Sequence, residues 1–205
     1  MIMIFGVVLA GGIGSRMGNV DKPKQYLLVG EKPIIIHTLE RFYVQNEFEK
    51  IIVLCPEEWV SHTKNLIKKY MKDTDRIVVL RGGDTRNETI MNSLRYIEKE
   101  YGLDDDTIVV THDSVRPFVT QRIIEENIKY AKEYGACDTA VAATDTIVYS
   151  QDNVLISDIP DRSKMYQGQT PQTFNALKLK NLYESLTEEE KAAIFSENAK
   201  KLLGI

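Results

Sequence analysis

The chain has 205 residues, of which 43% are hydrophobic and 27% charged, and its formal net charge is −4 at pH 7. These values are typical of one globular domain that can bury a core without disulfides or metal staples. The negative charge argues against a nucleic-acid partner, because phosphate-backbone binding favours a basic surface. No apolar run approaches the length of a membrane span, and Cys55 and Cys137 lie in separate apolar stretches. We therefore expect a cytoplasmic protein with reduced thiols, no membrane partner and no signal peptide.

Apolar runs rich in β-branched residues recur along the chain and predict strands that are buried on both faces of a sheet. These runs are residues 4–9, 50–55, 76–80, 107–111 and 139–143. Segments with a helical pattern alternate with them, at residues 33–44, 57–71, 87–102 and 120–136. Thr120 is a candidate N-cap of the last helix. The alternation predicts a doubly wound α/β fold with a mostly parallel sheet and helices on both faces. In such folds ligands bind at the carboxyl ends of the strands.

The alternation breaks at residues 145–162, where two short strand-like runs flank Gln151-Asp152-Asn153. Such a turn-forming cluster predicts a β-hairpin arm that projects from the α/β body. The chain has no internal repeat and no low-complexity linker, so a single domain over residues 1–205 is the simplest organisation. Residues 187–205 have the pattern of an amphipathic helix, with a capping box formed by Thr187 and Glu190.

The stretch LAGGIGSRMGNVDKPKQ, residues 9–25, directly follows the first predicted strand. Glycines at this place allow backbone N–H groups to approach a ligand closely, and Arg16, Lys22 and Lys24 indicate that the ligand is an anion. The dinucleotide-binding fingerprint is not met, because Met17 stands where its third glycine belongs, and the Gly-Lys-Ser/Thr of a Walker motif is absent. We therefore expect an anion-binding loop of another kind.

Three further stretches carry candidate site residues. GGDTRNETIMNSL, residues 82–94, can offer backbone groups to the edge of a base, with Asn87 or Thr89 opening the helix that follows. In THDSVRPFV, residues 111–119, Asp113 stands just past a buried strand, where it could help to hold a divalent ion. DRSKMYQGQTPQTF, residues 161–174, is rich in hydrogen-bonding side chains, and Arg162 is a candidate for a second phosphate.

As an ordered set, LAGGIGSRMG…PKQ, GGDTRNET, HDSVRP and QTPQTF resemble the nucleotidyltransferases that make CDP-activated polyols, over about residues 3–186. HDSVRPF and MYQGQTPQTF look more like ribitol-5-phosphate cytidylyltransferases, which supply CDP-ribitol for teichoic acid or capsule polymers. The alternative is a 2-C-methyl-D-erythritol 4-phosphate cytidylyltransferase of isoprenoid synthesis, a subfamily that typically has HDAARP. A third possibility is a CTP-binding protein with impaired turnover.

The resemblance implies that the phosphate of a polyol phosphate attacks the α-phosphorus of CTP and that pyrophosphate leaves. It implies that Arg16 and Lys24 stabilise the charge of the transition state. Asp113 would lie near Mg²⁺ or another divalent cation. The residues that the resemblance places around CTP are Leu9, Ala10, Gly11, Gly12, Gly83, Asp84, Arg86, Asn87, Thr89 and Ser114.

The resemblance also implies that Arg116, Thr146 and Arg162 position the polyol phosphate. In this family the arm reaches across a homodimer, so Arg162 would serve the partner's site. Relatives usually continue with a further strand and a substrate-binding lysine, for which the helical pattern of residues 187–205 offers no counterpart. We therefore expect weaker binding of the acceptor and impaired activity.

Overall fold

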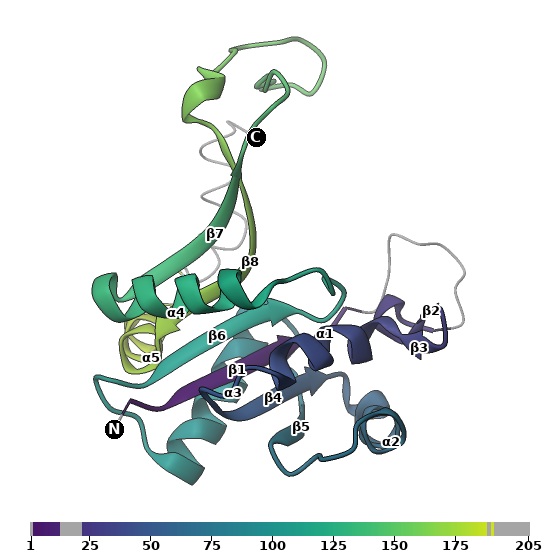
Figure 1. The fold of residues 1–205 in the computed structure, drawn as a ribbon. Coiled ribbons are helices and arrows are strands. Elements are labelled where there is room, and N and C mark those ends of the chain that lie inside the picture. The colour runs from purple at the N-terminus through teal and green to yellow at the C-terminus, as the bar shows by residue number, and fades with distance from the viewer. Residues whose placement is uncertain (1, 13–21, 188–189, 191–205) are drawn as a thin grey trace.

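The computed structural model describes residues 2–12, 22–187 and 190. A six-stranded sheet in the order β5-β4-β1-β6-β8-β7 forms its centre (Figure 1). The strands are β1 (Ile4–Leu9), β4 (Phe48–Cys55), β5 (Ile77–Arg81), β6 (Ile108–Asp113), β7 (Ala136–Ala142) and β8 (Tyr166–Asn175). The helices are α1 (Ile34–Tyr43), α2 (Val60–Tyr70), α3 (Arg86–Tyr101), α4 (Gln121–Tyr134) and α5 (Ala176–Ser185). A small antiparallel pair, β2 (Leu28–Val29) and β3 (Lys32–Pro33), precedes α1.

Strand β1 lies in the middle of the parallel part of the sheet. It pairs with β4 on one side and with β6 on the other, and Leu9 is in register with both Leu54 and Asp113. Every residue of β1 is buried. Because successive side chains of a strand point to opposite faces, this run contributes to two hydrophobic layers at once. The continuous apolar pattern of residues 4–9 is the signature of this central position.

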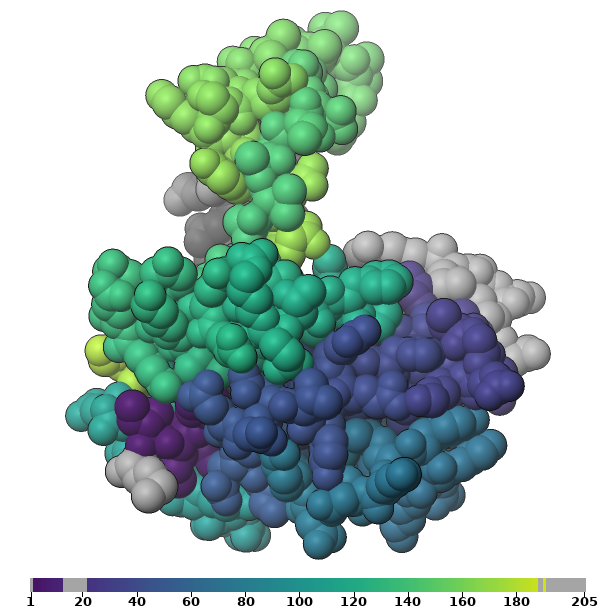
Figure 2. Space-filling view, in the orientation of Figure 1, coloured from purple at the N-terminus to yellow at the C-terminus, as the bar shows by residue number. Residues whose placement is uncertain are grey.

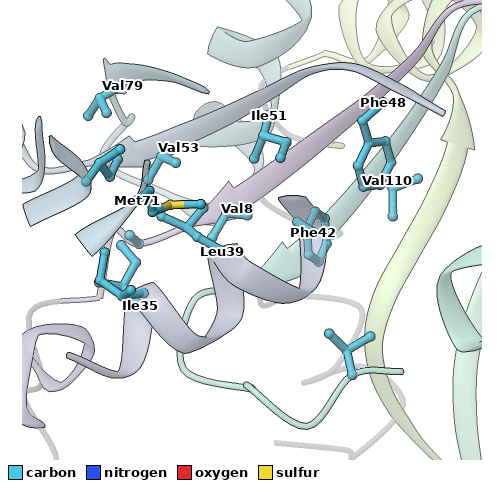
Figure 3. Close-up of a cluster of buried hydrophobic side chains, with 14 of the residues drawn as sticks. Val8, Ile35, Leu39, Phe42, Phe48, Ile51, Val53, Met71, Val79 and Val110 are labelled. Atoms are coloured by element: carbon cyan, nitrogen blue, oxygen red, sulfur yellow. The ribbon is translucent and has the colours of Figure 1, made fainter. Parts of the chain in front are cut away.

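Two hydrophobic clusters cover the two faces of the sheet. Ile4 and Val8 of β1 belong to the cluster beneath α1, which contains Leu39 and Phe42 (Figure 3). Phe5, Val7 and Leu9 belong to the cluster on the opposite face, together with these residues of α3: Ile90, Met91, Leu94 and Ile97. Gly6 gives α1 room to approach, because a Cβ at this position would lie 2.8 Å from the ring of Phe42.

Four of the five predicted strands are confirmed as parallel neighbours in this sheet. Residues 139–142 also lie in a strand, β7, but the expectation that it is buried on both faces is wrong, because β7 is an antiparallel edge strand with largely exposed side chains. Thr120 caps α4 as expected, since its side chain accepts a hydrogen bond from the N–H of Ile123. The expected start of α3 at Asn87 or Thr89 is also wrong. The helix begins at Arg86 with Thr85 as its N-cap.

The arm is longer than the sequence pattern suggests and is built differently. Strands β7 and β8 run side by side out of the sheet and carry residues 143–165 away from the body as a separate lobe (Figures 1 and 2). Within residues 145–162 a single bridge, between Tyr149 and Asp158, replaces the two expected strands. The arm therefore begins in the sheet itself, and residues 145–162 form its end.

The last described element is α5, whose N-cap Asn175 also pairs with Ile108 at the start of β6. Beyond it, Thr187 and Glu190 make the reciprocal hydrogen bonds of a capping box. The N–H of Thr187 donates to Glu190 Oε2 over 2.8 Å, and the N–H of Glu190 donates to Thr187 Oγ1 over 3.1 Å. The predicted helix after this box lies outside the described residues. In the part of the chain that the structure describes, no helix is long and apolar enough to cross a membrane.

Candidate active site

A cavity of about 340 Å³ opens at the carboxyl ends of β1 and β6. The strand order reverses at β1, which lies between β4 and β6, and such a reversal is where open α/β sheets bind ligands. Three loops supply most of the wall. The described lining residues are Leu9, Gly11, Gly12, Gln25, Gly83, Asp84, Thr85, Arg86, Thr89, Asp113 and Ser114.

The first wall is the glycine loop that follows β1. The N–H of Ala10 still donates to Leu54 O over 2.8 Å, so the loop leaves the sheet only after this residue. The side-chain amide of Gln25 then donates to Ala10 O over 2.7 Å and to Gly12 O over 3.1 Å. Gly11 and Gly12 are exposed, and no atom of the described residues lies within 4 Å of a Cβ built on Gly12. The loop therefore presents bare backbone to the cavity.

The second wall is the turn between β5 and α3. Thr89 is buried, and its hydroxyl accepts from the N–H of Gly83 over 3.0 Å and donates to Thr85 O over 2.8 Å. Thr85 caps α3 by accepting from the N–H of Glu88, whose carboxylate in turn accepts from the N–H of Asp84 over 2.8 Å. The bond to Thr85 satisfies one of the free N–H groups at the helix start. Together these bonds fix the backbone of the turn that faces the cavity.

The third wall carries the strongest charges. Asp113 lies at the end of β6 and accepts from Arg86 Nη1 over 2.6 Å and from Arg116 Nε over 3.0 Å. Burial acts to raise the pKa of Asp113, but the hydrogen bonds and charge of the two guanidiniums outweigh it and hold the pKa below its usual range. Arg86 also donates to Gln172 and Arg116 donates to Gln169, so the base of the arm holds both arginines.

The predicted role of Asp113 as a metal ligand does not fit this arrangement. Both of its carboxylate oxygens already accept from guanidiniums. Among the described residues, no group of three or more His, Cys, Asp and Glu side chains is gathered for a metal ion. Mg²⁺ prefers carboxylate, phosphate and water oxygens that are free to coordinate it. We therefore derive no step of the reaction through a metal ion held by Asp113.

Two hydrogen bonds fix the loop that follows β6. The N–H of Ser114 donates to Leu9 O over 3.0 Å, and its carbonyl accepts from the buried hydroxyl of Thr38 in α1 over 2.8 Å. His112 is buried beneath this loop and bonds to Arg116 O over 3.0 Å. Burial lowers the pKa of His112, so it is neutral at pH 7. It packs against the ring of Phe42 and has a structural role.

The structure brings together many of the predicted site residues. Those that line the cavity are Leu9, Gly11, Gly12, Gly83, Asp84, Arg86, Thr89, Asp113 and Ser114. Ala10 lies directly behind the glycines, and Arg116 pairs with Asp113 from outside the lining. Lys24 is exposed on a short 3₁₀ turn next to Gln25, and Asn87 is half-buried in the first turn of α3. Arg16 lies outside the described residues.

Thr146 and Arg162 are not part of this cavity. Both belong to residues 143–165 of the arm, where Arg162 donates to Thr144 O over 2.9 Å. Conversely, Gln25 and Thr85 line the cavity although the sequence analysis assigned them no role. In the sequence, Gln25 closes the PKQ segment that follows the glycine-rich stretch. Thr85 was visible as a Thr-x-x-Glu capping pattern, which is a sequence signature of a helix start.

Comparisons with known proteins match the fold of this chain. A synthase of 4-diphosphocytidyl-2C-methyl-D-erythritol from Anaerococcus prevotii superimposes with a TM-score of 0.73 at 26% identity, over 95% of this chain and 82% of that one. The 2-C-methyl-D-erythritol 4-phosphate cytidylyltransferase of Francisella tularensis gives 0.69 at 29% identity, over 94% and 86% of the chains. Residues 4–202 match the family described as IspD, 2-C-methyl-D-erythritol 4-phosphate cytidylyltransferase, so the match runs past residue 186. The chain belongs to this family of cytidylyltransferases.

Proposed function

We propose that the protein transfers a cytidylyl group from CTP to the phosphate of an acyclic polyol phosphate. An oxygen of the acceptor phosphate forms a bond to the α-phosphorus of CTP. The bond between this phosphorus and the bridging oxygen to the β-phosphate breaks, and pyrophosphate leaves. The observation that carries the proposal is the gathering of the glycine loop, the capped turn before α3 and the end of β6 around one cavity in a chain that matches the family.

Different parts of the cavity wall suit different parts of CTP. The bare backbone of Gly11 and Gly12 suits the triphosphate, which is the most highly charged part of the ligand. The turn at Gly83, Asp84 and Thr85 suits the cytosine, because its fixed backbone groups can read the edge of a base. Lys24 and Arg16, which flank the loop in sequence, would supply positive charge to the phosphoryl oxygens. Mg²⁺ would enter with the triphosphate and neutralise part of its charge.

Two acceptors are candidates, and different observations favour them. The comparisons favour 2-C-methyl-D-erythritol 4-phosphate, which appears in the description of the matched family and in the name of the Francisella tularensis enzyme. The segments HDSVRPF and MYQGQTPQTF favour D-ribitol 5-phosphate. Since the comparisons are the broader observation, 2-C-methyl-D-erythritol 4-phosphate is the first acceptor to test. CDP-ribitol for teichoic acid or capsule polymers is the second proposed product.

The experiment measures pyrophosphate release from CTP with each acceptor in turn, with MgCl₂ present. We expect turnover with one acceptor and a kcat/KM at least about 100-fold lower with the other, because an acceptor site positions one phosphate relative to the α-phosphorus. A reaction without acceptor measures hydrolysis of CTP and is subtracted. Tight CTP binding without pyrophosphate release for either acceptor would support a binding protein and contradict the proposal.

The arm suggests how the acceptor half of the site is completed. Its end carries exposed apolar side chains, among them Val154, Leu155 and Ile156. Apolar side chains gathered on a projecting element are typical of an interaction surface. We propose that two copies associate through their arms, and that Thr146 and Arg162 of one copy contact the acceptor phosphate in the site of the other. Light scattering of the purified protein tests the dimer.

A further inference from the structure

We propose that Gln25 is a positioning residue, whose side-chain amide holds the glycine loop in the conformation that receives the triphosphate. This inference rests on the proposed function, since it assumes that CTP is the ligand of the cavity. Beyond Ala10 the chain has left the hydrogen-bond ladder of the sheet, and Gly11 and Gly12 are the residues best able to change conformation. A contact from another segment is needed to hold Gly11 and Gly12 in one conformation.

Gln25 makes two hydrogen bonds to this loop. Its Nε2 donates to Ala10 O over 2.7 Å and to Gly12 O over 3.1 Å. One side-chain amide thus binds the carbonyl of the residue before Gly11 and the carbonyl of the residue after it. Because a trans peptide is planar, a fixed Ala10 carbonyl also fixes the direction of the Gly11 N–H. A backbone donor with a fixed direction is what phosphate recognition requires.

Burial strengthens this clamp. Gln25 is only 2% exposed, although it lines the cavity. The bond to Ala10 O is buried, so water does not replace it when it stretches, and a buried carbonyl that loses its donor is destabilised. The two bonds consequently favour one loop conformation over the alternatives that glycine allows.

The position of Gln25 is itself fixed from behind by the next residue. Tyr26 is buried, stacks on Trp59 with ring centroids 4.6 Å apart, and shares a 2.8 Å hydrogen bond with Thr63 of α2. Gln25 and Tyr26 follow Pro23 in a short 3₁₀ turn whose N–H groups bond back to Pro23 O and Lys24 O. The same turn carries Lys24. A single rigid segment therefore holds the loop conformation and presents the lysine beside it.

The test replaces Gln25 by methionine, which has a similar shape but no donor. Calorimetry measures the affinity of wild type and Gln25→Met for CTP and for CMP, which lacks the β- and γ-phosphates. We expect Gln25→Met to weaken CTP binding about 10-fold and CMP binding less than about threefold, because the clamp acts on the loop for the distal phosphates. In turnover, kcat/KM for CTP should fall about 10- to 100-fold, with the KM of the acceptor nearly unchanged.

Asn175→Ala is the matched control. Asn175 is also a buried side-chain amide, and it bonds to Asp105 O and to the N–H of Lys178 at the opposite end of the sheet. The Asn175→Ala variant should have a lower melting temperature than wild type, as Gln25→Met should. Its ratio of CTP to CMP affinity should equal that of wild type. If Gln25→Met does not fold, Gln25→Asn, whose donor is one methylene shorter, should change the ratio in the same direction.

The measurements distinguish a failure of the positioning role of Gln25 from a failure of the proposed cytidylyl transfer. An unchanged ratio of CTP to CMP affinity in a folded Gln25 variant overturns the positioning role, whatever the enzyme does in turnover. A wild-type protein that binds CTP but releases no pyrophosphate with either acceptor overturns the proposed function. The calorimetric comparison still decides the role of Gln25 in that case.

Discussion

Arg86 and Asp113 are 27 positions apart in the sequence, yet Arg86 Nη1 donates to Asp113 Oδ1 over 2.6 Å. The first is the opening residue of α3, and the second is the last residue of β6. Their pairing closes the wall of the cavity between the turn after β5 and the sheet. Arg116 holds the other carboxylate oxygen, so Asp113 joins two cations that would otherwise repel each other.

This pairing makes the stability of the protein depend on pH in the acid range. The pKa of Asp113 is lowered in the folded protein, because the two guanidiniums outweigh the effect of burial. A carboxylate with a lowered pKa stabilises the fold above its unfolded pKa, near about 4, and this contribution disappears as the pH falls through the folded pKa. We expect Asp113→Asn to have the lower free energy of unfolding at pH 7, with the difference shrinking below about pH 4. Urea unfolding of both proteins at several pH values measures this. Parallel pH profiles for the two proteins would contradict the prediction.

The turn before α3 gives a prediction based on steric contact. A Cβ on Gly83 would lie 2.4 Å from Glu88 Cγ and 2.6 Å from its Cβ, so Gly83→Ala must displace the side chain that accepts from the N–H of Asp84. We expect a loss of about 2 kcal/mol in the free energy of unfolding, through overpacking and the broken cap. Gly12→Ala is the control for stability, because none of the residues that the structure describes comes within 4 Å of its added Cβ. Equal melting temperatures for the two variants would show that Glu88 moves away without cost.

The sequence predicted the parallel core because the signal is local. Residues 4–9 and 50–55 are continuous apolar runs, and only a strand that is covered on both faces explains such runs at that length. The strand β8 was not predicted, because QGQTPQTF contains glutamines, a glycine and a proline and has the composition of a loop. It forms a strand because β6 and β7 pair with it from both sides, and this pairing joins residues far apart in the chain.

In the site, too, features set by neighbouring residues could be predicted, and contacts between distant segments could not. The glycines at residues 11, 12 and 83 could be predicted, because each follows a recognisable strand. The roles of their partners could not be. The bonds from Gln25 to the glycine loop, and the pairing of Asp113 with Arg86, depend on how segments converge in space. Asp113 thus lies at the cavity as expected, but its pairing with two arginines could not be predicted, since a carboxylate after a strand suits a cation of either kind.

Lys24 carries the next prediction. It is exposed and directly precedes Gln25, whose side chain bonds to the glycine loop, and we therefore expect it to contact phosphoryl oxygens. Lys24→Ala should reduce kcat about 100-fold, which corresponds to about 3 kcal/mol of lost transition-state stabilisation. The fold should be unaffected. Lys64→Ala, at an exposed position of α2, is the control for removing one positive charge. Single-turnover rates within about threefold of wild type for Lys24→Ala would refute the assignment. The same expectation for Arg16 stays a prediction from sequence.

The turn around Gly83 also predicts the choice of base. Its backbone is held by Thr89 and by the capping residues Thr85 and Glu88, so its donors and acceptors cannot rearrange to suit a different base edge. We expect the protein to bind CTP at least about 100-fold more tightly than UTP, because a site built for the cytosine amine leaves a buried group unpaired when it meets uracil. Calorimetry at the same Mg²⁺ concentration measures both affinities. Equal values would mean that this turn does not read the base.

The last prediction concerns the arm and distinguishes a shared site from a self-contained one. Arg162 lies on the arm and Lys24 lies beside the cavity of the body. If Arg162 acts in the partner's site, a mixed dimer of Lys24→Ala and Arg162→Ala subunits contains one site with both changes and one intact site. If Arg162 acts in its own subunit, both sites of that dimer carry one change.

Each variant alone should have low activity. An equimolar mixture that has exchanged subunits contains half mixed dimers, so a shared site predicts recovery of about a quarter of wild-type activity. Mixing Lys24→Ala with itself under the same exchange conditions controls for refolding effects. Recovery that grows with the time allowed for subunit exchange supports the shared site. A mixture that remains as inactive as its components after complete exchange, verified by differently tagged subunits, would place Arg162 in the site of its own chain.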